Sequence, residues 1–242
     1  IEILSQDRLL HIDMLETISR GQARLFDVSN QGVLLYHTGS DIWMMSTEHP
    51  ATAASMLETI FRFKHADPPV GEPQEWPSLL VTHQDFYISQ AQTQLGLPIT
   101  MPCWQSAYFP KTPLPIPPGP GCVQRLDRTN LSEIHRHYSN PVGLDYLRER
   151  VDAGVFHGVF IDGRLAGFAG VHAEGSLGML EVLPEYRRLG VAMQLQAFMT
   201  NWHLSLHYVP YAQIKVGNRP SVALQQKSGY TVSEKQVTWL MD

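Results

Sequence analysis

Apolar residues recur at two periods along the first half of the chain, so both helices and strands are expected there. Within residues 8–24 the apolar positions fall three apart, which is the spacing of one helix face. Residues 32–37 and 41–47 are short apolar runs rich in β-branched or aromatic side chains, and the turn Thr38-Gly39-Ser40 between them predicts a hairpin. The pattern further predicts a helix over 51–63, a strand over 78–82, a helix over 86–95 and a strand over 103–109.

The second half alternates strands and helices more regularly. Apolar runs at 155–161, 165–172 and 177–183 are separated by glycine-containing turns and predict a three-stranded meander. Residues 188–207 carry an apolar stripe at helical spacing and predict a long helix. The remaining expected elements are a strand over 122–126, helices over 130–138 and 144–153, a strand over 211–216, a helix over 220–228 and a strand over 231–240.

Prolines separate the two halves, and eight of them lie between residues 98 and 120. Because proline fixes φ and has no backbone N–H, this stretch is neither a helix nor a central strand. We therefore predict an N-terminal α/β half over residues 1–110, an extended proline-rich linker over 111–120 and a second domain over 121–242.

Composition narrows the class of protein. Hydrophobic residues make up 43% of the chain and charged residues 17%, so a sizeable core is expected and global disorder is excluded. With 18 Lys and Arg against 23 Asp and Glu, no basic surplus is present to neutralise nucleic-acid phosphates. No apolar run approaches the roughly 20 residues of a membrane span, and the first residues do not read as a signal peptide. Two cysteines are too few for a disulfide framework or a cysteine zinc site, and we expect a cytoplasmic protein without nucleic-acid, membrane or metal partners.

One turn carries most of the chemical signal. Residues Arg187 to Ala192 read Arg-x-x-Gly-x-Ala, between a predicted strand and the start of the long helix. The first turn of a helix has unpaired N–H groups and the positive end of the helix dipole, so it binds phosphate oxygens where nothing blocks the approach. Gly190 removes a side chain at that point, and Arg187 and Arg188 add fork-shaped donors that suit a pyrophosphate. The alternative interpretation is that Gly190 only relieves crowding and that both arginines are solvated.

A second cluster lies further along the chain. Asn218 follows a predicted strand and is a typical cap for the short helix that begins there, and Gly229 is a typical residue to end that helix. The order strand, Arg-x-x-Gly-x-Ala, long helix, strand, Asn-x-x-Ser-x-x-Leu and Gly-Tyr over residues 121–242 resembles the GNAT superfamily of acetyl-CoA-dependent N-acyltransferases. Tyr211-Ala212-Gln213, behind a separate N-terminal half, is most similar to the glycine N-acyltransferase-like branch. The first half resembles a degenerate copy of the same fold without a phosphate turn.

The resemblance implies an α/β fold with a mixed, mostly antiparallel central sheet flanked by helices, and acetyl-CoA as cosubstrate. In the family, the strand that holds Leu180–Leu183 splays away from the strand that holds Tyr211–Val216, and the backbone of Val182 pairs with the pantetheine arm as an added strand would. The backbone amides that follow hold the pyrophosphate. The residues implied to bind the cosubstrate are Val182, Leu183, Arg187, Arg188, Leu189, Gly190, Val191, Ala192, Asn218 and Ser221.

Acyl transfer from a thioester requires a neutral amine, donors for the developing oxyanion and a proton for the leaving thiolate. Glu181, next to Val182, is the first candidate for the base, and Glu174, at a turn, is the second. His172 ends a strand and can titrate near neutral pH. For each of the three the alternative is a structural role, as a solvated or ion-paired carboxylate or a packed histidine.

The sequence departs from the family at Gln225. Family members commonly have a tyrosine directly after the residue that matches Leu224, as the acid that protonates the thiolate, and glutamine cannot act as that acid. The thiolate then leaves unaided, or Tyr211 or Tyr230 takes this role. The oxyanion donor that the family uses, a backbone N–H near Val182, is not removed by any substitution here.

These features predict an N-acetyltransferase that transfers an acetyl group to a primary amine by direct attack within a ternary complex. The acceptor partner is a small-molecule or peptide amine, because an amino acid, a polyamine, an antibiotic and a protein N-terminus all present the same nucleophile. Three alternatives stay open: transfer of a longer acyl group, transfer to a hydroxyl, and a CoA-binding regulatory module without turnover. The N-terminal half closes one side of the acceptor site or forms a homodimer surface.

Overall fold

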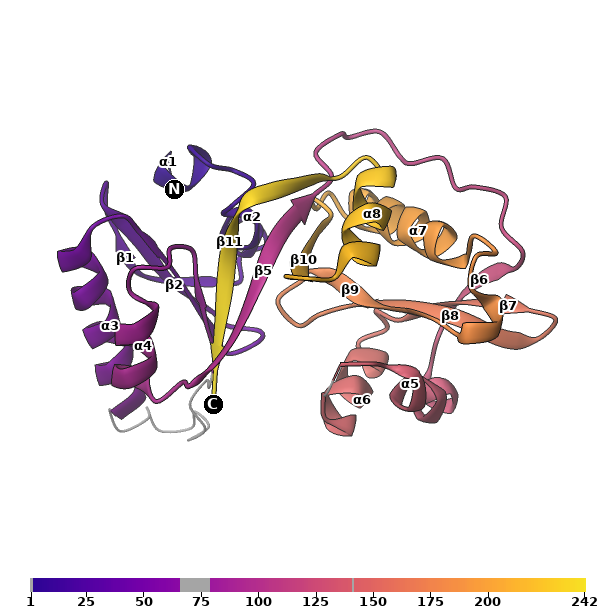
Figure 1. The fold of residues 1–242 in the computed structure, drawn as a ribbon, viewed down its shortest axis with the longest axis horizontal. Helices are drawn as coiled ribbons and strands as arrows, with labels where there is room; N and C mark the ends of the chain where they lie inside the picture. The colour runs from indigo at the N-terminus through magenta and orange to yellow at the C-terminus, as the bar shows by residue number, and fades with distance from the viewer. Residues whose placement is uncertain (1, 66–78, 141) are drawn as a thin grey trace. The chain divides into compact units, whose positions relative to one another are not determined.

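The computed structural model describes residues 2–65, 79–140 and 142–242, and strands and helices alternate along them (Figure 1). The elements of the first half are α1 (Glu2–Ser5), α2 (Ile12–Ser19), β1 (Ala23–Val28), β2 (Gly32–His37), β3 (Ile42–Thr47), α3 (Pro50–His65), β4 (Leu79–Thr82), α4 (Ile88–Leu95) and β5 (Ile99–Ala107). Those of the second half are β6 (Cys122–Arg125), η1 (Arg128–Asn130), α5 (Leu131–His137), α6 (Leu144–Asp152), β7 (His157–Ile161), β8 (Arg164–Val171), β9 (Leu177–Val182), η2 (Pro184–Tyr186), α7 (Val191–Ser205), β10 (Tyr211–Lys215), α8 (Arg219–Lys227) and β11 (Thr231–Met241). Residue 78, where the strand predicted over 78–82 begins, lies outside the described residues.

The chain forms two compact units that are not consecutive along the sequence. Unit 1 comprises residues 1–105, 214–218 and 232–242, and unit 2 comprises residues 106–213 and 219–231. The last strand, β11, therefore contributes mainly to unit 1, whereas the proline pattern places it in the second domain.

Unit 1 contains a sheet that is covered on both faces. Its strand order is β1-β2-β3-β4-β11-β5-β10, in which β3 and β4 are parallel and β4 and β11 are antiparallel. Successive residues of a strand point to opposite faces, so Leu34 packs with residues of α3 and α4 while Leu35 packs with residues of α1 and α2. The helix predicted over 8–24 is shorter in the structure, because Gly21 turns the chain with a φ of 70° and the edge strand β1 follows.

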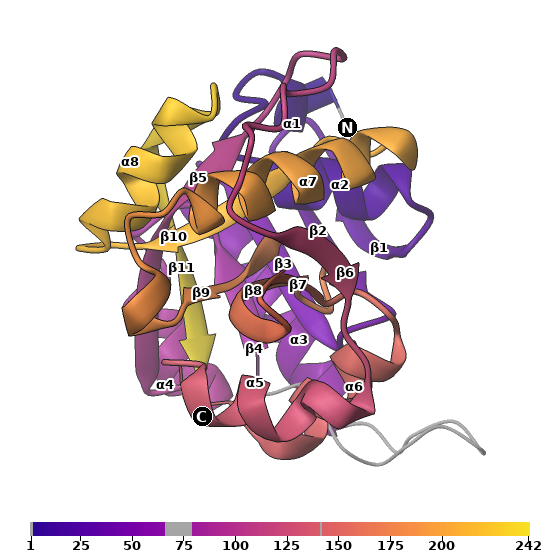
Figure 2. The ribbon, with the colours of Figure 1, turned by 90° about the vertical axis from the view of Figure 1, so that its right-hand side faces the viewer.

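Unit 2 is built on the antiparallel sheet β6-β7-β8-β9. Helix α7 covers one face of this sheet, and α5 and α6 cover the other (Figure 1, Figure 2). Val159 and Ala166 pack with Leu195 of α7, whereas Phe168 packs with Ile134 of α5 on the opposite side. The predicted fold class, α/β with a mostly antiparallel sheet flanked by helices, is confirmed.

The prediction that the proline-containing stretch holds no central strand is wrong for its first part, because β5 contains only one proline, Pro102, and lies between β11 and β10 in the sheet. The proline-rich segment 108–121 forms no helix or strand and is held to α7 by side chains. Asn201 accepts a hydrogen bond from the Leu114 N–H (2.7 Å) and donates one to the Leu114 carbonyl (2.8 Å). Gln194 donates to the Gly121 carbonyl at 2.8 Å. Two side-chain amides of α7 thus satisfy backbone groups that strand pairing satisfies elsewhere.

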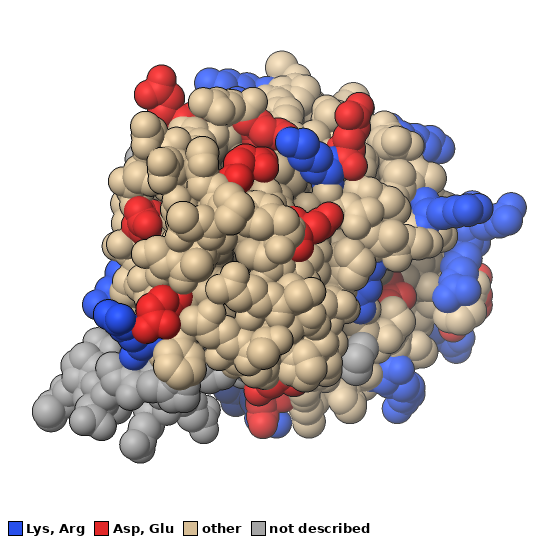
Figure 3. All heavy atoms as spheres, turned by 60° about the vertical axis from the view of Figure 1, so that its left-hand side comes forward, with Lys and Arg blue, Asp and Glu red and all other residues tan. Residues whose placement is uncertain are grey.

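The composition raised the questions of membrane spans and of surface charge. None of the described helices combines the length and the apolar character that crossing a membrane requires. On the face shown in Figure 3, most of the surface is uncharged, and acidic and basic side chains are interspersed.

Candidate active site

Strand β9 leads into the turn that carries the Arg-x-x-Gly-x-Ala sequence. The short 3₁₀ helix η2 follows the strand, and the backbone then takes positive φ angles at Arg188 (64°) and Gly190 (90°) before α7 begins at Val191. A left-handed backbone disfavours any side chain, so glycine is the residue that enters α7 here without strain.

The backbone amides of this turn are unpaired. Within the described residues, the N–H groups of residues 188–193 donate to no other residue, and the next one, that of Gln194, donates to the Gly190 carbonyl at 3.0 Å. A Cβ placed on Gly190 meets no atom within 4 Å, so the space above it is open. Residues 187–190 are exposed. The turn therefore offers unpaired donors, the positive end of α7 and two arginines, which suit an anion with several oxygens.

Strand β9 is an edge strand. It pairs with β8 on one side, and in the described sheets it has no partner on its other side, since β10 belongs to the other sheet. A bulge at Met179, with a φ of 50°, interrupts the pairing with β8 between Gly178 and Glu181. Because an unpaired strand edge is a template for an extended ligand, β9 and the turn together suit a molecule with an extended arm and a pyrophosphate.

Unit 1 has the same order of strand, helix and strand in β3, α3 and β4, but a different geometry. There the two strands are hydrogen-bonded to each other in parallel. Only Glu48 and His49 connect β3 to α3. A closed strand pair and a short turn with an acidic residue leave no place for the same kind of ligand.

The remaining residues predicted to bind the cosubstrate lie at the ends of strands and helices. Val182 is the last residue of β9, and Leu183 after it is buried. The Arg187 Nε donates to the Val182 carbonyl at 3.2 Å, which holds the guanidinium beside the strand end. Asn218 is exposed between β10 and α8, and Ser221 is half-buried in the first turn of α8.

The first candidate base, Glu181, is fixed to the loop between α5 and α6. Its Oε1 accepts hydrogen bonds from the Ser139 N–H (3.1 Å) and from the Ser139 hydroxyl. Among the described residues, nothing donates to its Oε2 and no Lys or Arg pairs with it. One carboxylate oxygen is thus held in place and the other is left for a ligand or a water.

Glu174 and Tyr211, the other two predicted catalytic residues, meet in the structure. The Tyr211 hydroxyl donates to the Glu174 backbone carbonyl at 2.8 Å. Glu174 is 5% exposed, and its carboxylate accepts a hydrogen bond from the Ser176 hydroxyl. Tyr211 is fully buried, so its hydroxyl serves to hold the turn that carries Glu174.

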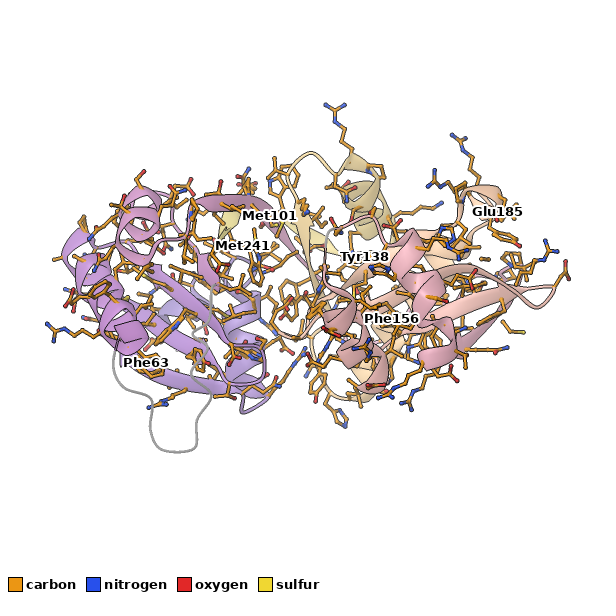
Figure 4. All side chains as sticks on the ribbon, turned by 90° about the horizontal axis from the view of Figure 1, so that it is seen from below. Phe63, Met101, Tyr138, Phe156, Glu185 and Met241 are labelled. Carbon is orange, nitrogen blue, oxygen red and sulfur yellow. The ribbon has the colours of Figure 1, made fainter. Side chains whose placement is uncertain are left out.

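The negative charges of Glu181 and Glu174 both act on Tyr138. Burial raises the pKa of Tyr138, and the negative charges of Glu181 and Glu174 raise it further. Tyr138 packs on the apolar cluster that includes Phe156, on the side of the sheet that α5 and α6 cover (Figure 4). Both carboxylates therefore act on this side of β9.

Sequence reasoning missed Tyr146. Its hydroxyl lies 3.1 Å from His172 Nδ1 and accepts a 3.2 Å hydrogen bond from the Ala173 N–H. Burial raises the pKa of Tyr146, and the charge of Glu174 adds to this. The sequence gives little sign of this role. The helical spacing of residues 144–153 identifies Leu147 as buried, and Tyr146 is only the residue before it.

Comparison with known families finds a match over the region that holds this site. Residues 123–230 match the model of the acetyltransferase (GNAT) family. This segment is therefore similar to the GNAT family. Members of the family use acyl-CoA, usually acetyl-CoA, and the unpaired amides of residues 188–193 fit its pyrophosphate. No curated protein matches the sequence.

Solved structures with the same fold cover nearly the whole chain. A Drosophila protein is 17% identical, with a TM-score of 0.67 over 97% of this chain and 89% of its own. A GCN5-related N-acetyltransferase from Kribbella flavida is 15% identical, with a TM-score of 0.59 over 97% and 95%. A GCN5-related N-acetyltransferase-like protein from Streptococcus suis is 14% identical, with a TM-score of 0.55 over 97% and 96%. At these identities the likeness establishes the fold alone.

At Gln225, where the sequence departs from the family pattern that it resembles, the structure turns the side chain inward. Gln225 is 5% exposed and donates to Gln196 Oε1 at 3.3 Å. Tyr230 is also buried, its hydroxyl lies 2.6 Å from that of Thr200, and burial raises the pKa of Tyr230. Gln225 and Tyr230 therefore belong to a hydrogen-bonded interior against α7.

Proposed function

We propose that this chain is an acetyl-CoA-dependent N-acetyltransferase that transfers an acetyl group to a primary amine of a small molecule or peptide. The observation that carries the proposal is the run of unpaired amides at residues 188–193, with open space above Gly190. These amides would bind the diphosphate of CoA, and Arg187 and Arg188 would add positive charge. The sequence Tyr211-Ala212-Gln213 supports a place near the glycine N-acyltransferase-like branch.

The free edge of β9 supports the rest of the binding mode. The pantetheine arm would pair with the backbone of Val182, with Asn218 and Ser221 beside it. The turn follows the end of β9, so an arm that starts there and follows the strand runs back toward its beginning. We therefore place the thioester near the bulge at Gly178 and Met179.

The reaction needs no covalent enzyme intermediate. The amine nitrogen attacks the thioester carbonyl, the C–N bond forms, and the C–S bond breaks to release the CoA thiolate. Glu181, held at Oε1 by Ser139, would take the proton that makes the amine neutral, directly or through a water. Glu174 is the second choice for this role, with Tyr211 positioning it. The thiolate would leave unaided, because Gln225 is not an acid.

A second candidate function is a CoA-binding regulatory module without turnover. The inward position of Gln225 favours it, because no acid then stands ready for the thiolate. Transfer of longer acyl groups, or transfer to a hydroxyl, remain variants of the enzyme hypothesis, because the turn would recognise only the CoA part of the cosubstrate.

Thiol release distinguishes these functions. We expect acetyl-CoA to bind in calorimetry, and free CoA thiol to appear when acetyl-CoA is mixed with spermidine, glycine, 2-phenylethylamine or an unblocked tripeptide. Propionyl-CoA and octanoyl-CoA in the same assay test the length of the acyl group. Binding without thiol release from any of these amines would favour the module, and absence of acetyl-CoA binding would overturn both functions.

A further inference from the structure

Tyr146 and His172 form a hydrogen-bonded pair that the proposed function leaves without a role. Tyr146 Oη and His172 Nδ1 are 3.1 Å apart, and the Ala173 N–H donates to the same Oη at 3.2 Å. A tyrosine hydroxyl has one proton, and its 3.1 Å distance to His172 Nδ1 lets it donate that proton when Nδ1 carries none. In that arrangement His172 is a neutral imidazole with its own proton on Nε2, and burial, which lowers the pKa of His172, favours the neutral form.

The pair lies at the part of β9 where we place the thioester. A Cβ on Gly178 would come within 2.7 Å of His172 Nε2, so the absence of a side chain there makes room for the imidazole ring. Gly178 directly precedes the bulge at Met179. Tyr146 and His172 therefore lie on the same side of β9 as both candidate carboxylates.

The charged and titratable groups around the pair come from three segments. Burial lowers the pKa of His172 most, Glu174 in the hairpin raises it, and Arg150 on α6 lowers it. Tyr138, at the end of α5, faces Tyr146. The Glu174 carboxylate thus favours a positive charge on His172, which is the charge that a proton received from Tyr146 would leave there.

We propose that Tyr146 and His172 form a proton relay for the transfer step, an inference that rests on the proposed function. A protonated amine loses two protons when it becomes an amide, and Glu181 takes the first. As the C–N bond forms, one of the two N–H bonds of the neutral amine breaks and its proton goes to Tyr146 Oη, while the other N–H stays in the amide. The Tyr146 O–H breaks at the same time, and its proton goes to His172 Nδ1. Tyr146 ends neutral, and the His172 imidazolium gives its proton to water after product release.

Kinetics on the full chain test the relay, with the best amine of the panel above as acceptor. Tyr146→Phe and His172→Gln should each lower kcat about 100-fold, and the double variant should be no slower than either, because both changes remove one relay. The wild-type kcat should fall on acidification with a midpoint below 6.5, the ordinary histidine pKa, and this midpoint should vanish in His172→Gln. His49→Gln, at an exposed histidine of unit 1, is the control and should keep both rate and midpoint.

Two further measurements separate the relay from a structural role and from the proposed function. Nitrogen NMR of the wild-type imidazole should place the His172 proton on Nε2, and acetyl-CoA affinity should be unchanged in both single variants. Wild-type rates and midpoint in the variants, a proton on Nδ1, or lost acetyl-CoA binding in either variant would overturn the relay. A wild-type chain that releases no thiol with any amine would instead overturn the proposed function, and the NMR result would still test the pair.

Discussion

The hydroxyl of Tyr211 in β10 donates a 2.8 Å hydrogen bond to the backbone carbonyl of Glu174 in the hairpin between β8 and β9. Tyr211 is fully buried, and this bond uses its only proton. Tyr211 therefore holds the hairpin in place through this hydrogen bond, which we call the hairpin clamp. The hairpin carries both Glu174 and His172, which are two of the candidate proton acceptors.

Replacing Tyr211 with phenylalanine tests this clamp. The change keeps the ring but leaves the buried Glu174 carbonyl without its donor, so we expect the free energy of unfolding to fall by about 1–3 kcal/mol in urea titrations. Tyr36→Phe removes an exposed hydroxyl that donates to Asp41, and it should change this free energy by less than about 0.5 kcal/mol. Slower thiol release in Tyr211→Phe without any loss of stability would instead indicate that Tyr211 is the acid.

Gly190→Ala and Gly163→Ala separate backbone strain from ligand binding. Both glycines have a positive φ, 90° and 76°, and a Cβ on either meets no atom within 4 Å. Each alanine should therefore cost about 1–2 kcal/mol of stability. Only Gly190→Ala should weaken CoA binding in calorimetry, by about ten-fold or more (about 1.4 kcal/mol), because its Cβ enters the space above the unpaired amides. Equal CoA affinity in the two variants would place the diphosphate elsewhere.

A buried polar network in unit 1 makes its stability depend on pH. The ring nitrogens of His83 lie 2.9 Å from Asp13 Oδ1 and 3.0 Å from the Met45 carbonyl, and His11 Nε2 lies 2.8 Å from the Ser46 hydroxyl. Burial, helped by the charge of His83, lowers the pKa of His11 to about 4. Burial by itself raises the pKa of Asp13, but the charge and hydrogen bond of His83 outweigh it and lower the pKa.

We expect the stability of unit 1 to fall between pH 6.5 and pH 4. The unfolded chain protonates His11 near pH 6.5, and the folded chain does so only near pH 4, so acid favours the unfolded state by about 3 kcal/mol over this interval. The depressed pKa of Asp13 adds stability above its ordinary value of 3.8, which is lost as the pH falls further. Urea unfolding against pH measures this, and His11→Gln should flatten the dependence between pH 6.5 and 4. The same slope in His11→Gln would exclude His11 as its source.

Asn201→Ala tests whether α7 holds the proline-rich segment. The change removes both hydrogen bonds to Leu114, so we expect stability to fall by about 1–2 kcal/mol and trypsin to cleave faster after Lys111. Ser205→Ala removes a hydroxyl that bonds within its own helix, to the Trp202 carbonyl, and should leave cleavage unchanged. Equal cleavage in the two variants would show that other contacts hold the segment.

Features that depend on neighbouring residues can be predicted from the sequence alone. The pattern from Arg187 to Ala192 predicts a turn before a helix, because free N–H groups at a helix start and a positive φ at glycine follow from local backbone rules. The meander over residues 155–183 follows in the same way from apolar runs and turn residues, and the structure has β7, β8 and β9 there.

By itself, then, the sequence determined the elements, the fold class and the composition of the turn, and the tertiary structure decided which edges pair and which polar groups meet. Thr82 and Thr238 pair across β4 and β11 although 156 residues separate them, while β9 keeps a free edge in the described sheets. The sequence equally gives no sign that Tyr146 contacts His172, which is 26 residues away, or that the side chain of Gln225 turns inward. The physical reason is that periodicity shows which face of an element is buried, whereas distances between side chains on different elements arise only when those faces pack together.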